Sequence, residues 1–129
     1  MPRRVMLDAS VLIDYFRKKN KADTLFATTV RQYDSQLISV VAKLEVFYGC
    51  RPELVEHWRT VFAPMTVVPF TDDMVAQSHD IILNLKRKSL LIDIEDIMIA
   101  ATALVLDVPL ATLNRKHFER IDGLKLFPF

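Results

Sequence analysis

The chain has 129 residues, of which 51% are hydrophobic and 26% charged, and its formal net charge at pH 7 is +1. This length predicts one domain over residues 1–129, and the composition excludes a disordered chain. No apolar run is long enough to cross a bilayer. The lone Cys50 excludes an internal disulfide and fits a reducing compartment, which favours the cytoplasm. The near-neutral charge excludes nucleic-acid binding through a field of the whole molecule.

The first predicted strand ends at a carboxylate. Val5 to Leu7 form a short apolar run, Asp8 follows it, and Ser10 can cap the helix that comes next. A carboxylate at the C-terminal tip of a buried strand lies where open α/β sheets place their ligands. The alternative is that Asp8 only accepts hydrogen bonds from the first helical turn.

Helices and short apolar strands alternate along the rest of the chain. Helices are expected over residues 22–33 and 41–49, from Pro52, from Thr71 and over 94–106; strands are expected over 36–39, 65–70, 108–111 and 124–127. Pro69 puts its strand near a sheet edge. The alternation predicts a three-layer α/β fold, with a central, mostly parallel sheet covered by helices on both faces and the Asp8 strand in its middle.

Two acids occupy positions where hydrophobic residues are expected. Glu45 lies between Val41 and Tyr48 on the predicted apolar side of its helix, which also carries Leu44, and Asp96 lies in the most apolar helix of the chain. Neither has a basic neighbour three or four residues away. A buried, unpaired carboxylate costs roughly several kcal/mol, so each requires an ion pair with a distant cation or a shared metal. With Asp8 at a strand tip as a third acid, a shared metal ion is a more economical explanation than a separate ion pair for each acid.

Further polar side chains adjoin these acids. Asp93 shares the face of Asp96 and either joins the cluster or caps the helix. Thr112 and Asn114 follow a second predicted strand, where the amide oxygen can complete an acidic pocket. Oxygen ligands favour Mg²⁺, with Mn²⁺ as an alternative, and carboxylate-bound ions of this kind hydrolyse phosphodiesters.

Basic residues cluster at three places in the chain. They occupy residues 17–21 and 86–88, and the third cluster is Arg115, Lys116 and His117. The first two clusters end predicted helices, where cations are favoured, but a positive rim around an acidic centre also suits a phosphodiester. His117 is expected to pack or to contact substrate rather than to act as a general base.

Four segments resemble the PIN-domain ribonucleases and, within them, the VapC-type toxins. They are residues 7–13, 43–49, 96–103 and 111–118, and they occur in the family's order and spacing. The second half, D-x-x-I-A-A-T-A followed by T-x-N-x-x-H-F, is the more specific. By this resemblance Asp8, Glu45 and Asp96 would be the catalytic, metal-binding acids. Asn114 would stand where many members have a fourth acid, which puts a second metal in doubt.

The resemblance also implies what the protein acts on and binds. It implies Mg²⁺-dependent endonucleolytic cleavage of RNA, a homodimer, and inhibition by a cognate antitoxin. Ser10, Asp93 and Thr112 would support the site, and Arg115, Lys116 and His117 would contact substrate. The alternative function is a catalytically inactive PIN-like module that binds RNA or a protein.

Two other classes of protein with acidic residues at the tips of strands fit the sequence less well. A receiver domain requires an acid after a mid-chain strand, but Val68-Pro69-Phe70 provides none. A haloacid-dehalogenase-like phosphatase requires a second Asp two residues after the first, and that position is Ser10.

Overall fold

The computed structural model describes residues 2–128, and its centre is a four-stranded parallel sheet. The strands are β1 (Arg4–Leu7), β2 (Ser35–Ser39), β3 (Thr66–Val68) and β4 (Leu110–Ala111), in the order β3-β2-β1-β4. Leu7 pairs with Ile38 on one side and with Ala111 on the other. The Asp8 strand therefore lies inside the sheet, and β3 lies at an edge, as the sequence predicts.

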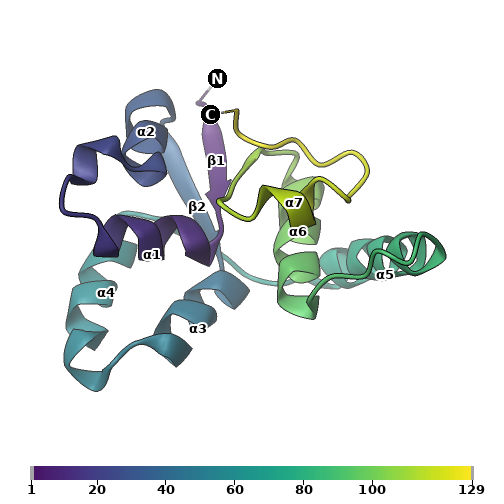
Figure 1. Cartoon of the computed structure of the whole chain (residues 1–129), viewed down its shortest axis with the longest axis horizontal. Helices are drawn as coiled ribbons and strands as arrows, with labels where there is room; N and C mark the ends of the chain where they lie inside the picture. The colour runs from purple at the N-terminus through teal and green to yellow at the C-terminus, as the bar shows by residue number, and fades with distance from the viewer. Residues whose placement is uncertain (1, 129) are drawn as a thin grey trace.

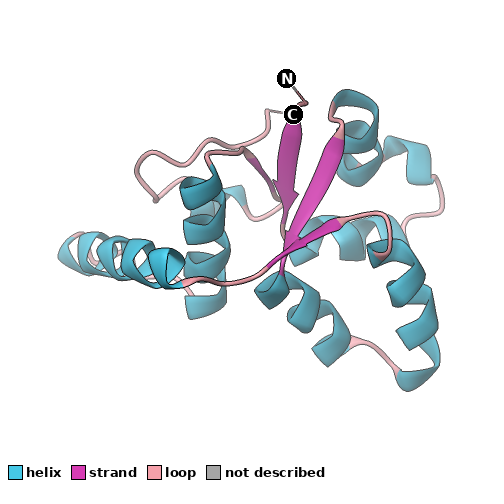
Figure 2. Ribbon diagram, turned by 180° about the vertical axis from the view of Figure 1, so that it is seen from behind, coloured by secondary structure: helices cyan, strands magenta, loops and turns pink. Residues whose placement is uncertain are grey.

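Helices flank the sheet on both sides (Figures 1 and 2). They are α1 (Ala9–Arg17), α2 (Leu25–Gln32), α3 (Val40–Gly49), α4 (Val55–Phe62), α5 (Asp72–Arg87), α6 (Ile94–Leu106) and α7 (Arg115–Phe118), with 3-10 turns η1 (Lys21–Asp23) and η2 (Pro52–Leu54). This arrangement confirms the three-layer α/β fold. No helix among residues 2–128 is long and apolar enough to span a membrane.

Short polar side chains start the helices that follow β1, η1 and β2. The backbone N–H of Ser10 donates to Asp8 at 2.9 Å, that of Ala27 to the Thr24 hydroxyl at 3.2 Å, and that of Val41 to the Ser39 hydroxyl at 3.1 Å. Each cap satisfies an N–H that has no partner within its own helix. Because Asp8 directly follows β1 and Ser39 is the last residue of β2, α1 and α3 both begin at the carboxyl edge of the sheet.

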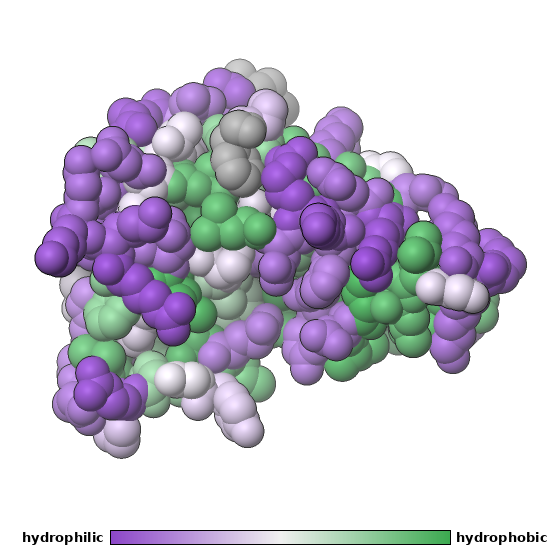
Figure 3. All heavy atoms as spheres, in the orientation of Figure 1, coloured by the Kyte–Doolittle hydropathy of each residue, from purple (hydrophilic) through white to green (hydrophobic). Residues whose placement is uncertain are grey.

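One hydrophobic core joins the sheet to the helices around it. Val5, Met6 and Leu7 of β1 are fully buried, as are Leu85 of α5 and Ile99 of α6. Trp58 packs in this core, as predicted, with its ring centroid 5.9 Å from that of Phe62. On the face drawn in Figure 3, apolar surface is visible at several separate places, one of them over α5.

Three expectations about the elements are wrong. The helices predicted from residue 22 and from Pro52 each open with a separate 3-10 turn. Residues 124–127 form no strand, because only Leu126 bridges to Leu110 beyond the short edge strand β4. On α3, Leu44 and Tyr48 are 66% and 91% exposed, while Ala42 and Val46 face the core. Helix α3 is apolar on nearly every side, so its periodicity does not identify the buried face.

Candidate metal site at the carboxyl edge of the sheet

Asp8 is held in place by three hydrogen bonds. It is 3% exposed, and its Oδ1 accepts from the backbone N–H and the hydroxyl of Ser10, while its Oδ2 accepts from the hydroxyl of Thr112. Ser10 and Thr112 follow different strands, so the two tips are joined through this carboxylate. Burial raises the pKa of Asp8, and the two hydroxyls oppose that rise. Asp8 therefore caps α1 and also presents a fixed carboxylate.

The loop after β4 is tied to the same point. The N–H of Leu113 donates to the Ser10 hydroxyl at 3.1 Å, and the N–H of Asn114 donates to the Thr112 hydroxyl at 2.9 Å. Asn114 is the exposed N-cap residue of α7, and its side chain makes no capping bond. These bonds make Ser10 and Thr112 positioning residues. The sequence places Ser10 two residues after Asp8 and Thr112 after a second predicted strand. It does not predict the hydrogen bonds that Leu113 and Asn114 donate to these two hydroxyls.

Glu45 differs from Asp8 because its carboxylate has an atom without a partner. Oε1 is buried and is the one such side-chain atom among the described residues with no hydrogen-bond partner. Burial first, then the charges of Asp96 and Asp8, raise the pKa of Glu45 to about 7. A buried carboxylate oxygen with no donor and with acids around it is destabilising until a cation reaches it.

Asp96 lies in the first turn of α6 with a side chain that is 15% exposed. Its Oδ2 is 3.3 Å from Nδ1 of His117, which comes from α7. Burial raises the pKa of Asp96, and the contact with His117 opposes the rise. Reasoning from the sequence expected His117 to pack or to contact substrate, and it missed this pairing, since the two residues are 21 positions apart.

The remaining candidate site residues are Asp93, Arg115 and Lys116. Asp93 is the exposed N-cap residue of α6 without a capping bond, and its charge contributes to raising the pKa of both Glu45 and Asp96. Arg115 donates to the Phe127 carbonyl at 2.9 Å and pairs with Glu119, and Lys116 is exposed. Among residues 2–128, Lys116 makes no hydrogen bond or ion pair with the three acids.

The three acids come from elements that meet beyond the carboxyl end of β1, where α1, α3 and α6 converge (Figure 1). Within residues 2–128, no three acidic, histidine or cysteine side chains already stand at metal-ligand spacing. The carboxylates nevertheless influence one another's pKa, and the orphaned Glu45 oxygen fits a cation ligand. A cation would draw these oxygens together.

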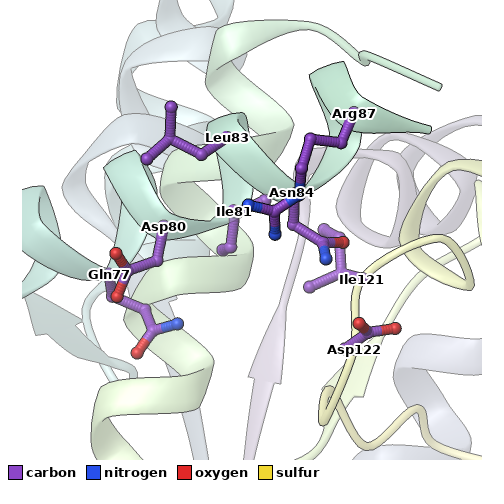
Figure 4. Close-up of a pocket in the computed structure, with 8 residues that line it drawn as sticks. All are labelled: Gln77, Asp80, Ile81, Leu83, Asn84, Arg87, Ile121 and Asp122. Atoms are coloured by element: carbon purple, nitrogen blue, oxygen red, sulfur yellow. The ribbon is translucent and has the colours of Figure 1, made fainter. Parts of the chain in front are cut away.

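A separate hollow of about 330 Å³ lies between α5 and residues 121–122. It is lined by Gln77, Asp80, Ile81, Leu83, Asn84, Arg87, Ile121 and Asp122, all drawn in Figure 4. Asp8, Glu45 and Asp96 do not line it, so this hollow is separate from the three acids.

Comparisons with known proteins identify the family of the chain. The chain is 31% identical to the Ribonuclease VapC1 of Methanocaldococcus jannaschii over 96% of its own length and 87% of the relative's. It is 34% identical to the Ribonuclease VapC10 of Mycobacterium tuberculosis, with coverage of 94% and 90%. The solved VapBC-1 of nontypeable Haemophilus influenzae superposes with a TM-score of 0.85 over 96% of each chain, at 23% identity. The PIN domain model matches residues 5–124, and the chain belongs to the PIN domain family.

Proposed function

We propose that the protein is a divalent-cation-dependent endoribonuclease and the toxin of a toxin–antitoxin pair. One observation carries the proposal, the buried Oε1 of Glu45, which lacks a partner and lies close enough to Asp8 and Asp96 for their charges to raise the pKa of Glu45. An inactive PIN-like module that only binds RNA or a protein has no use for three carboxylates that destabilise one another.

The three acids take different roles in this proposal. Asp8 and Asp96 hold the cation, and Glu45 either holds it or orients the attacking water through Oε1. Their oxygens favour Mg²⁺, or Mn²⁺ in its place. The bound cation would acidify the attacking water and neutralise the charge that develops on the leaving oxygen. Ser10 and Thr112 keep the Asp8 carboxylate fixed through their donated hydrogen bonds.

Other residues support the acids or face the RNA. Asn114 can add an amide oxygen at the second strand tip, and Asp93 adds negative charge at the start of α6. His117 holds the Asp96 carboxylate from α7. We assign phosphate contacts to Lys116 and Arg115 at the rim, in a cytoplasmic reaction on cellular RNA.

A second copy and an antitoxin are the protein partners in this proposal. The exposed Leu44 and Tyr48 of α3 offer apolar surface that a second copy would cover, so we expect a homodimer. We expect the antitoxin to inhibit cleavage, in line with the relatives that were solved as VapBC complexes.

Cleavage mapping on total cellular RNA tests the proposed function. Purified protein with Mg²⁺ should cut internally at defined positions, and excess chelator should stop the cutting. Cleavage that continues unchanged in chelator, or the absence of any cleavage with either ion, would overturn the proposal.

A further inference from the structure

The carboxylate of Asp96 is held in a different way from that of Asp8. Both oxygens of Asp8 accept hydrogen bonds from hydroxyls, one from Ser10 and one from Thr112. Asp96 lies in the first turn of α6, and its side chain is 15% exposed. Its Oδ2 meets Nδ1 of His117 at 3.3 Å, across from α7. The orientation of the Asp96 carboxylate is therefore coupled to the placement of α7.

Charges around Asp96 favour a carboxylate that is turned away from the site. Burial first, and then the charges of Asp93 and Glu95, raise the pKa of Asp96. The charge of Asp96 in turn raises the pKa of Glu45. An aspartate in the first turn of a helix reaches solvent by a change of side-chain rotamer, and repulsion from the other acids favours that change. The hydrogen bond to His117 opposes it.

His117 extends from a short helix that is anchored to the rest of the fold. Helix α7 lies against α6 (Figure 1), and Phe118, the next residue, is fully buried. Arg115 at the start of α7 donates to the Phe127 carbonyl at 2.9 Å. The backbone N–H of His117 donates to the Asn114 carbonyl at 3.1 Å. The imidazole ring is therefore carried by a fixed backbone, as a side chain that orients another must be.

The contact also defines the proton on the ring and the oxygen that it engages. An ionised carboxylate only accepts hydrogen bonds, so Nδ1 of His117 is the donor and a neutral ring keeps its lone pair on Nε2. A neutral donor orients the carboxylate of Asp96 and leaves its charge in place, whereas a lysine or arginine there would compete with a cation for that charge. Because the donor engages Oδ2, Oδ1 is left for the cation.

We propose that His117 is a positioning residue that turns Asp96 so that Oδ1 faces the cation, an inference that rests on the proposed cation site. Hydrogen bonds from the surroundings of a metal site to its ligands typically raise metal affinity by about 10- to 100-fold. His117 acts through Nδ1 and through Asp96. Contact with RNA, or removal of a proton from water, would use Nε2 instead.

Two amide substitutions separate the roles of the two ring nitrogens. In His117→Asn the amide nitrogen is bonded to Cγ, as Nδ1 is in histidine, so it can donate to Asp96 from nearly the same place. In His117→Gln the amide lies one carbon further out, close to the position of Nε2. His117→Ala has a donor at neither position. His79→Ala is the matched control, because His79 is an exposed residue of α5.

Calorimetric titration with Mn²⁺ tests the inference without any dependence on RNA cleavage. His117→Ala should bind Mn²⁺ about 10- to 100-fold more weakly than the wild type, and His117→Asn should return to within about threefold of it. His117→Gln should stay as weak as His117→Ala, and His79→Ala should match the wild type, with circular dichroism to check folding. Equal affinities of the wild type and His117→Ala, or recovery by His117→Gln and not by His117→Asn, would overturn the inference.

RNA cleavage at increasing Mn²⁺ concentrations separates this role from substrate contact and from proton transfer. If His117 acts only on cation binding, saturating Mn²⁺ should bring His117→Ala to within about threefold of the wild-type rate. A rate that stays below this level at saturation would overturn the inference. If the wild type binds Mn²⁺ more tightly than His117→Ala but cuts no RNA, the proposed ribonuclease function fails and the inference stands. A wild type that binds no Mn²⁺ would overturn both.

Discussion

The tip of β1 and the middle of α3 hold their carboxylates in opposite ways. Both carboxylate oxygens of Asp8 accept hydrogen bonds, Oδ1 from Ser10 and Oδ2 from Thr112. Glu45 has a buried oxygen that no donor reaches. The two acids lie close enough for the charge of Asp8 to raise the pKa of Glu45. We propose that the two acids differ in role, with Asp8 as a cation ligand of fixed orientation and the unpaired oxygen of Glu45 available to the cation or its bound water.

The largest effect is expected at Asp96, whose charge raises the pKa of both Asp8 and Glu45. Asp96→Asn removes a proposed cation ligand and should lower RNA cleavage by at least about a thousandfold, with little change in the fold. Asp80→Asn is the matched control, an exposed position on α5 whose rate should stay at the wild-type value. The measurement is a cleavage rate for each protein, with circular dichroism to check folding. Unchanged cation-dependent cleavage by Asp96→Asn would refute the assignment.

The second prediction concerns the stability of variants at Glu45 and at Asp8. In chelator at pH 8, Glu45→Gln should stabilise the protein by about 2 kcal/mol, because it removes a buried charge that has no partner. Asp8→Asn should gain less, since an amide nitrogen replaces one oxygen that accepts hydroxyl protons. Urea denaturation of the three proteins measures both differences. Equal gains for the two variants would mean that the hydrogen bonds to Asp8 do not distinguish the sites.

The pH dependence of the metal-free protein follows from the same comparison. The pKa of Glu45 is raised from 4.5 to about 7 in the folded state, so between these values the folded protein binds more protons than the unfolded chain. With respect to this group, stability is therefore greatest below pH 4.5, and it falls as pH rises through 7. Denaturation at pH 5 and pH 8 should show the fall in the wild type and a smaller one in Glu45→Gln. An equal fall in the free energy of unfolding in both proteins would contradict a raised pKa of Glu45.

The smallest effect concerns the support of Asp8. Thr112→Val removes the hydroxyl that Asp8 accepts and the acceptor of the Asn114 N–H, and should lower cleavage by about tenfold. Thr29→Val is the control, because its buried hydroxyl bonds only within α2, to Phe26. Both variants should lose similar stability, and only Thr112→Val should lose activity. A similar rate for the two would assign Thr112 to the fold alone.

Much of this site can be predicted from the order of residue types along the chain. A polar residue after each short apolar run identifies Asp8 and Thr112, because strand tips of a parallel sheet gather at one edge. An acid within an apolar helix identifies Asp96. These signals are local, and each survives small errors in element bounds.

The rest depends on contacts that local patterns do not encode. The exposed Leu44 and Tyr48 show that an almost entirely apolar helix does not declare its buried face. The carboxylate of Glu45 is partly buried although Leu44 and Tyr48, which were expected on the same buried face, are exposed. The Asp96–His117 contact and the Leu113–Ser10 bond join segments that only the complete fold brings together.

The central claim is that the open oxygen of Glu45 is a cation ligand, and calorimetric titration with Mn²⁺ at pH 7 tests it most directly. Because the pKa of Glu45 is about 7 before the ion binds, occupancy should release protons, seen as a dependence of the binding heat on the buffer. We predict binding with proton release in the wild type, and weaker binding with less release in Glu45→Gln. Equal affinity and equal proton release in both proteins, or no binding by the wild type, would contradict the account.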